Sequence, residues 1–339
     1  MISIVIPIYN EEQGLSLLYD RLTEAAVQWE EKFEVVLVDD GSSDSSNSIM
    51  RGFVENDDRF HLVELSRNFG HQGAISAGLE YARGDAVVVM DGDLQDPPEE
   101  LPIFLDKWRE GYQVVYAIRT ERKEGLPKRM AYSAFYRFLA FISDIDIPLD
   151  SGDFALIDRS VVDVLKKELP ENIRFVRGLR AYAGFRQIGI PYKRDERAAG
   201  EAKYTFRKLL ILAMDGVFGF STLPLRMATY VGLFISLLSF AVGLFFIVHR
   251  IFNFKVLGYS PEDTPGLASL AAGIYFLGGV ILTFLGILGE YIGRVYIEVK
   301  RRPPYIVAAT YGAVADGTAR APETGREERP ATNKEDEQG

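Results

Sequence analysis

The 339-residue sequence contains no cysteine, which excludes disulfide bonds, zinc–thiolate sites and thiol nucleophiles. Histidine is scarce as well: His61, His71 and His249 are too scattered along the chain to suggest a metal cluster. Positive charge is in deficit, because 48 acidic residues outnumber 38 basic ones and leave a formal net charge of −10. A nucleic-acid partner bound through a general basic field is therefore not expected.

Two long apolar runs, at 227–248 and 267–289, carry no charged residue. Each exceeds the roughly 20 residues that a helix needs to span a bilayer. Buried core helices are the alternative, but apolar runs of this length on all faces are rare in soluble domains. The sequence predicts transmembrane helices at 225–252 and 267–292, joined by an extracytoplasmic loop at 253–266.

Basic residues gather at the two outer ends of this helical pair, whereas the loop between the runs has a balanced charge. Excess positive charge next to a span favours the cytoplasmic side. We therefore expect a multi-pass protein of the cell inner membrane, with the domain before the spans and both termini in the cytoplasm. The flanking basic residues are Arg207, Lys208 and Arg226 before the first run and Arg294, Lys300, Arg301 and Arg302 after the second.

The first 118 residues alternate strand-like and helix-like patterns. Val- and Ile-rich runs separated by helix-prone stretches such as 12–32 and 71–83 indicate an α/β fold with a mostly parallel, doubly wound sheet. Ligands of such sheets bind beyond the C-terminal strand ends. The predicted strands are 2–8, 33–40, 61–66, 85–90 and 113–117.

Polar residues follow four of these strands at the point where each ends. Ordinary turn and capping chemistry would explain any one group, but four groups on one edge favour a nucleotide site. They comprise Pro7, Tyr9, Asn10 and Glu11 after the first strand, 39–44 after the second, 66–70 after the third, and Asp91 with its neighbours after the fourth.

The fourth strand runs into Asp91, Gly92 and Asp93. Side chains on a regular strand alternate faces, so Asp91 and Asp93 are expected to point the same way. Hard oxygen ligands of this kind suit Mg²⁺ or Mn²⁺, which are usually bound by one or two carboxylates together with substrate phosphates. The alternative is an acidic loop without a metal role.

Residues 119–224 show a mixed pattern. An amphipathic helix is expected at 127–143, and a loop and strand at 151–157. The segment 203–220 reads either as an interfacial helix at the headgroup level or as a linker helix packed on the globular domain. The predicted divisions are a catalytic domain at 1–204, a juxtamembrane amphipathic helix at 205–224, and a cytoplasmic tail at 293–339 that is disordered from about 308.

Four motifs together resemble the inverting glycosyltransferase family 2 with its GT-A fold: IPIYNEE, VVLVDDGSSD, SRNFGHQGAISAGL and MDGDLQDPPE. With the paired apolar runs, residues 1–306 resemble a polyisoprenyl-phosphate glycosyltransferase. The likeness is greatest to the bactoprenol glucosyltransferases, with the dolichyl-phosphate mannose synthases as relatives. This resemblance implies transfer of a hexose, glucose from UDP-glucose, to a polyprenyl phosphate for cell-envelope glycosylation.

The resemblance also implies residue roles. The nucleotide's base and ribose would contact Pro7, Tyr9, Asn10, Glu11 and Asp40. The divalent cation and diphosphate would contact Asp91 and Asp93, with Gln95 as a third metal ligand, and Lys203 would contact a phosphate although Ala202 replaces the family's serine before it. The lipid phosphate would contact Arg119, Arg129 and Ser133.

Asp153, in the segment SGDF, is a candidate catalytic residue with two open roles. It acts either as a base toward the acceptor or as a structural carboxylate that caps a loop or pairs with an arginine. A phosphate monoester has a second pKa of about 6 and is already an anion at neutral pH, so the acceptor needs little help from a base.

Alternative functions remain open at this level. GDP-mannose or a UDP-amino-arabinose derivative could replace UDP-glucose as the donor. A processive polysaccharide synthase would need more spans and a Gln-x-x-Arg-Trp motif, which the nearest segment, Phe185-Arg186-Gln187, does not provide. A non-catalytic membrane scaffold disagrees with the intact carboxylates. Small residues such as Gly273, Gly278 and Gly279 would allow spans to pack within one chain or in a homo-oligomer.

Overall fold

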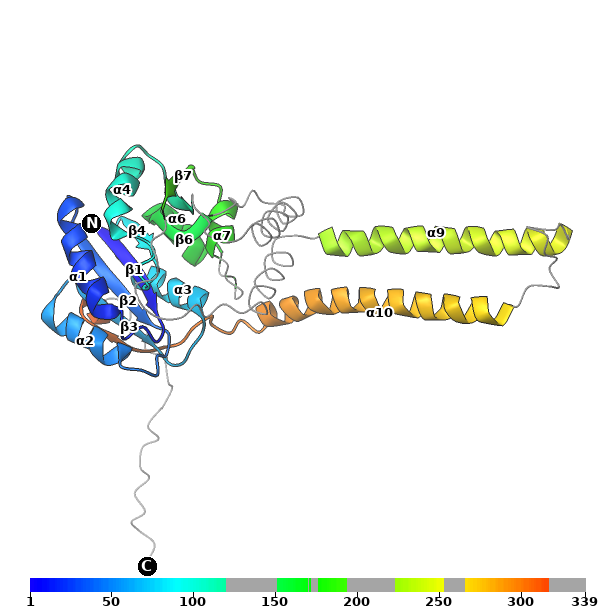
Figure 1. Ribbon diagram of the computed structural model, residues 1–339, viewed down its shortest axis with the longest axis horizontal. Helices are drawn as coiled ribbons and strands as arrows, with labels where there is room; N and C mark the ends of the chain where they lie inside the picture. Colours follow the sequence, from blue (N-terminus) through cyan, green and yellow to red (C-terminus); the bar gives the residue numbers. More distant parts are fainter. Residues whose placement is uncertain (120–150, 170, 172–175, 194–222, 253–265, 317–339) are drawn as a thin grey trace, which may run out of the picture.

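The computed structural model spans the 339 residues and describes 1–119, 151–169, 171, 176–193, 223–252 and 266–316. A sheet covered by short helices forms the body, and two long helices project from it side by side (Figure 1). The predicted helices at 127–143 and 203–220 lie outside the described residues.

Within the described residues, one eight-stranded sheet has the order β7-β5-β6-β4-β1-β2-β3-β8. The pairs β1–β2, β1–β4, β2–β3 and β5–β7 are parallel, whereas β6 is antiparallel to β4 and β5, and β8 is antiparallel to β3. The mostly parallel sheet predicted from the sequence is confirmed. The strands are β1 (Ile2–Ile8), β2 (Phe33–Asp39), β3 (Phe60–Leu65), β4 (Ala86–Val89), β5 (Val114–Arg119), β6 (Ser151–Asp158), β7 (Gln187–Tyr192) and β8 (Val307–Tyr311).

Helices cover both faces of the sheet, which explains why the central strands are apolar at successive positions. Within β1, Ile4 and Ile6 belong to one buried cluster and Val5 to the other. The first cluster includes residues of α1 (Leu15–Ala25), α2 (Ser46–Asn56) and α4 (Leu101–Arg109). The second includes residues of α3 (His71–Tyr81), α6 (Arg159–Lys167) and α7 (Val176–Tyr182).

The predicted disorder from about residue 308 is wrong as far as residue 316. Strand β8 adds to the free edge of β3, and η3 (Ala313–Asp316) follows it. The sequence there has few large apolar side chains, but an edge strand gains backbone hydrogen bonds to its neighbour whatever its side chains are. Side chains stabilise this segment as well. The Arg51 guanidinium lies 4.4 Å from the centre of the Tyr311 ring, and the Val314 side chain is buried.

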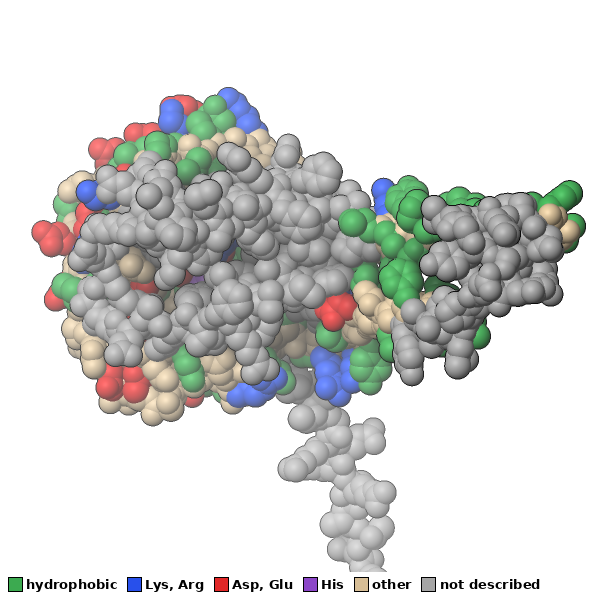
Figure 2. All heavy atoms as spheres, turned by 45° about the vertical axis from the view of Figure 1, so that its right-hand side comes forward, with side chains coloured by type: hydrophobic (Ala, Val, Ile, Leu, Met, Phe, Trp, Pro, Cys, Tyr) green, Lys and Arg blue, Asp and Glu red, His purple; other side chains and the backbone are tan. Residues whose placement is uncertain are grey.

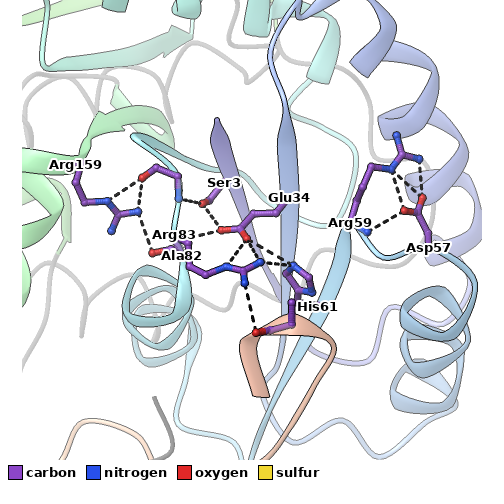
Figure 3. A network of polar contacts seen from close by, with 10 residues as sticks. Ser3, Glu34, Asp57, Arg59, His61, Ala82, Arg83 and Arg159 are labelled. Atoms are coloured by element: carbon purple, nitrogen blue, oxygen red, sulfur yellow. Dashed lines mark hydrogen bonds and ion pairs between the residues drawn. The ribbon is translucent and has the colours of Figure 1, made fainter. Parts of the chain in front are cut away.

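A buried polar network lies at the N-terminal ends of the parallel strands, at the edge opposite the polar strand ends (Figure 3). Glu34 accepts hydrogen bonds from the Ser3 hydroxyl at 2.6 Å and from Arg83 Nη2 at 2.6 Å. His61 lies beside it, with Nε2 3.5 Å from Glu34 Oε2. Arg83 Nη1 also donates to the Ala313 carbonyl at 3.4 Å. The network thus ties the segment after the long helices back to the body.

This network predicts a stability change at acid pH. Burial alone would raise the pKa of Glu34, but hydrogen bonds from His61, Ser3 and Arg83 outweigh it and lower the pKa from 4.5 to about 2. The group therefore contributes stability that is fully present above about pH 4.5 and is lost as the pH falls toward 2. That gap corresponds to about 3 kcal/mol.

The measurement compares the free energy of unfolding of the wild type and Glu34→Gln between pH 7 and pH 2.5. We expect the advantage of the wild type to shrink steadily below pH 4.5, because the glutamine does not titrate. A difference that stays constant across this range would contradict the network's ionic character.

The two long helices are α9 (Leu223–Phe252) and α10 (Gly266–Val299). Each contains a window that is long and apolar enough to cross a membrane, Leu225–Val242 and Phe276–Val299, and neither window is buried in the structure. Figure 2 shows their hydrophobic surface projecting from the body, with basic side chains near its base. Among the described residues at the two ends next to the body, Arg226, Lys300, Arg301 and Arg302 are exposed. The predicted fold class is thereby confirmed: an α/β sheet followed by two helices suited to a bilayer.

Candidate active site

The polar strand ends predicted from the sequence meet at one edge of the sheet, because β1, β2, β3 and β4 run parallel to one another. The loops after β1 and β2 are joined through side chains. Asn10 Oδ1 accepts a hydrogen bond from the Ser43 amide at 2.7 Å, and the Asn10 amide donates to Ser42 Oγ at 3.1 Å. The Glu11 amide donates to Ser46 Oγ at 3.0 Å. The ring of Tyr9 remains exposed beside them.

Asp40 has a structural task at this edge. Its buried carboxylate accepts hydrogen bonds from the amides of Phe69, at 2.6 Å, and Gly70, at 3.0 Å. Burial raises the pKa of Asp40, although these two donors partly offset the effect. Asp40 thus fixes the loop between β3 and α3, a task that the sequence did not indicate.

Asp91 and Asp93 lie beyond the strand that was expected to carry them, since β4 ends at Val89. The alternation of a strand therefore does not set their directions, so the strand on which that prediction was based does not extend to them. A turn sets them instead: Leu94 has a φ of 59°, and the Gln95 amide donates to Asp93 Oδ1 at 3.1 Å. Gly92 allows close packing in this turn, because a Cβ there would lie 2.4 Å from Ile8 Cδ1 and the isoleucine would have to move. Both carboxylates remain partly exposed.

The donor set fits a divalent cation that is completed by a substrate. Within the described part of the chain, no group of three or more acidic or histidine side chains is close enough to hold a metal alone. Mg²⁺ rarely needs such a group, because one or two carboxylates plus substrate phosphates and water fill its six positions. Asp91 and Asp93 meet that requirement at the edge where ligands of parallel sheets bind.

Asp153 lies on β6, whose neighbour in the sheet is β4. Arg177, on α7, donates to both of its carboxylate oxygens, from Nε at 2.8 Å and Nη2 at 3.0 Å. His71 Nε2 lies 3.2 Å from Asp153 Oδ2, and Gln72 Nε2 donates to the same oxygen at 3.5 Å. Of the two roles open in the sequence, pairing with an arginine is therefore observed.

The protonation of this cluster follows from its charges. Burial alone would raise the pKa of Asp153, but the Arg177 charge and the hydrogen bond with His71 hold it well below its ordinary value. Burial alone would lower the pKa of His71, yet Asp153 and Asp91 raise it to about 9. At neutral pH the cluster is therefore an ionised carboxylate between two cations.

Three members of this cluster were missed by the sequence reasoning. His71 and Gln72 lie in the segment SRNFGHQGAISAGL, which drew attention as a motif but not as single residues. Arg177 belongs to no recognised motif and lies 24 residues after Asp153. Only the fold brings α7 next to β6. Arg180, on the same helix, is buried next to them, and burial lowers its pKa to about 10.

The residues expected to hold the lipid phosphate are only partly placed. Arg119 is the last residue of β5 and pairs with Tyr192 of β7. Arg129, Ser133 and Lys203 lie outside the described residues.

Comparison with known proteins defines the class to which this site belongs. The chain belongs to glycosyl transferase family 2, whose family model matches residues 3–165, and it is a glycosyltransferase. Among curated relatives, the uncharacterized glycosyltransferase YkcC of Bacillus subtilis is 46% identical over 91% of this chain and 94% of its own length. The SfII prophage-derived bactoprenol glucosyl transferase of Shigella flexneri is 40% identical over 91% of this chain and 98% of its own.

Proposed function

We propose that the protein transfers glucose from UDP-glucose, with inversion, to a polyprenyl (undecaprenyl or bactoprenyl) phosphate and so makes a lipid-linked sugar for cell-envelope glycosylation. One observation carries this proposal: the acidic turn at Asp91 and the cation-rich cluster around Asp153 meet at the same sheet edge, in a chain with two membrane-length helices. The similarity to a bactoprenol glucosyl transferase along nearly the whole chain supports the acceptor class.

The donor would lie along the ends of β1, β2 and β4. The exposed Tyr9 ring offers a surface for a base, and the joined loops beside it offer backbone and amide groups to a ribose. Lys203 would reach a phosphate oxygen. In this arrangement the proposed nucleotide-binding residues are Pro7, Tyr9, Asn10, Glu11, Asp40, Asp91 and Lys203.

A divalent cation, Mg²⁺ or Mn²⁺, would be held by Asp91 and Asp93, with Gln95 as a third ligand. When bound, such an ion stabilises the negative charge that develops on a leaving diphosphate. The two carboxylates supply the charge that attracts the ion. The backbone N–H of Gln95 donates to Asp93 and keeps that carboxylate oriented.

The acceptor phosphate would bind to Arg119, Arg129 and Ser133. Arginine matches phosphate oxygens with a forked pair of donors, and it offsets the repulsion between an anionic acceptor and an anionic donor. The acceptor is already a nucleophilic anion at neutral pH, so its position matters more than its deprotonation.

A base role for Asp153 is disfavoured by its contacts, since Arg177, His71 and Gln72 occupy its oxygens and its pKa is well below the ordinary value. We expect Asp153→Asn, assayed with saturating donor and lipid phosphate on folded protein, to keep its turnover within about tenfold of the wild type. Loss of a general base typically lowers the rate about 10²- to 10⁴-fold. A loss in the upper part of that range, without unfolding, would restore Asp153 as the base.

The membrane arrangement is part of the proposal. The helices α9 and α10 would cross the inner membrane, with the connection at 253–266 outside and the catalytic domain at the cytoplasmic surface. The exposed basic residues next to the body support this orientation, because cytoplasmic flanks are enriched in Lys and Arg. A cysteine placed in the chain, which has none of its own, would report each side by its reaction with an impermeant thiol reagent.

The function is tested by incubating membranes that contain the protein with labelled UDP-glucose and undecaprenyl phosphate. A labelled glycolipid is the expected product, and chelation of divalent cations should abolish it. A water-insoluble polymer would favour a processive synthase, and no product would favour a scaffold. Parallel reactions with GDP-mannose and a UDP-amino-arabinose derivative separate the proposed sugar from its alternatives.

A further inference from the structure

We propose that His71 is a positioning residue, which holds the Asp91 carboxylate in the orientation that binds a divalent cation beside the donor diphosphate. The proposal rests on the proposed function, because it assigns a further residue to the same metal site. Nothing in the composition of the chain indicates this role, since its three histidines are far apart in sequence.

The backbone of His71 is held in place from two sides. His71 is the first residue of α3, and the Asp40 carboxylate binds the amides of the two residues before it, Phe69 and Gly70. Earlier in the same loop, the Ser66 amide donates to the Ile306 carbonyl at 2.9 Å, in the segment that joins α10 to β8. The imidazole therefore extends from a point fixed by both the sheet and the strand that follows the long helices.

The imidazole bridges two carboxylates through a single nitrogen. His71 Nε2 lies 3.2 Å from Asp153 Oδ2 and 3.5 Å from Asp91 Oδ1. Two carboxylates that face one nitrogen require that nitrogen to carry a hydrogen atom, whichever charge the ring has. Asp153 is nearly buried, whereas Asp91 is 28% exposed, so the bridge runs from the interior to the open edge of the site.

The inner end of the bridge is rigid. Arg177 binds both oxygens of Asp153, and Gln72 adds a third contact. Gln72 is itself fixed, because its Oε1 accepts a hydrogen bond from the Val176 amide at 2.9 Å. His71 therefore reaches Asp91 from a rigid end, with its Nε2 3.5 Å from Asp91 Oδ1.

This geometry matches a general property of metal sites. Carboxylates that bind a metal are themselves hydrogen-bonded, and removal of such a supporting group typically weakens metal binding or activity about 10- to 100-fold. The ion-pair contact of His71 Nε2 with Asp91 Oδ1 would support that carboxylate in this way. Asp93 accepts a hydrogen bond from the backbone N–H of Gln95, so each of the two carboxylates is contacted by a different group.

The test measures Mn²⁺ binding to the purified full-length protein in detergent, by electron paramagnetic resonance, in the presence of UDP. We expect His71→Leu, which has similar volume but no donor, to weaken Mn²⁺ binding about 10- to 100-fold. His71→Gln places an amide donor at a similar distance and should restore binding to within about threefold. Glu80→Gln, at the far end of the same helix, is the matched control and should bind Mn²⁺ like the wild type.

Kinetics add a readout that a merely structural role would not change. In His71→Leu the Mn²⁺ concentration for half-maximal activity should rise, while the KM for the lipid phosphate stays unchanged. If His71→Leu does not fold, His71→Asn serves instead, since its shorter amide cannot reach Asp91 and should show the same weakening.

Unaltered Mn²⁺ binding in a folded His71→Leu or His71→Asn variant would overturn the proposal, as would failure of the wild type to bind Mn²⁺ with UDP. The proposed function fails separately: a wild type that binds Mn²⁺ through His71 but forms no glycolipid retains the positioning role and loses the acceptor assignment.

Discussion

Asp91→Asn is expected to lower turnover about 10³-fold or more while leaving the fold intact. The substitution keeps the size of the side chain but removes the negative charge that attracts a divalent cation. A bound metal contributes several kcal/mol to stabilising a leaving group, and each 1.4 kcal/mol corresponds to about tenfold in rate. The side chain is partly exposed in a turn after β4, so the cost to stability should be small.

Asp85→Asn provides the matched control for this experiment. Asp85 precedes β4 at the opposite edge of the sheet, is 75% exposed and contacts the N-terminal amine. Initial rates of glycolipid formation at saturating Mg²⁺ should be unchanged in this control. Activity in Asp91→Asn within about tenfold of the wild type would contradict the metal assignment.

Arg177→Ala is expected to lower both stability and activity. The substitution removes the two Arg177 hydrogen bonds from the Asp153 carboxylate, which is nearly buried. Removing one partner of a buried ion pair lowers the free energy of unfolding by about 3 kcal/mol. Because Asp153 also holds His71, the loss should reach the cation site and reduce turnover. The free energy of unfolding in detergent and the rate at saturating substrates are the two measurements.

A double-mutant cycle isolates the pair from other effects. Arg177→Ala and Asp153→Ala should together cost less than the sum of the two single changes, because the second change removes the charge that the first left unpaired. Arg177→Lys should not restore the wild type, since lysine cannot form two hydrogen bonds in a fixed fork. Strict additivity in the cycle would show that the contact contributes little.

The central sheet was predictable because its strands are apolar at successive positions and are bounded by polar turns. Strand β1, at Ile2–Ile8, matches the predicted bounds, and β2 differs by one residue. Strands β7 and β8 were not predicted, because each is short and lies at an edge of the sheet. Their existence depends on partners far away in the sequence, namely β5 and β3.

The site was predictable where its residues follow strands and unpredictable where distant elements converge. The parallel order brings Asn10, Asp40 and Asp91 to one edge, as their positions after three strands indicated. The contact of His71 with Asp153 joins residues 82 apart in sequence, and that of Arg177 joins α7 to β6. No local pattern carries such contacts, because they depend on how helices pack on the sheet.

Strand β8 links the two long helices to the body of the protein. After α10 the chain contacts the loop before α3 and then pairs with the sheet edge and reaches the Glu34 network. The body of the protein is therefore in contact with a segment that follows the second long helix. This connection would suit the proposed reaction, in which a water-soluble donor meets a lipid acceptor.

The most direct test of the account uses purified protein in vesicles with labelled UDP-glucose and two matched lipids, undecaprenyl phosphate and undecaprenol. The account predicts a labelled glycolipid with the phosphate, none with the alcohol, and none from Asp91→Asn with either lipid. Transfer to the alcohol at a comparable rate, or product from the phosphate without a divalent cation, would contradict the claim that a metal-bound donor reacts with a lipid phosphate.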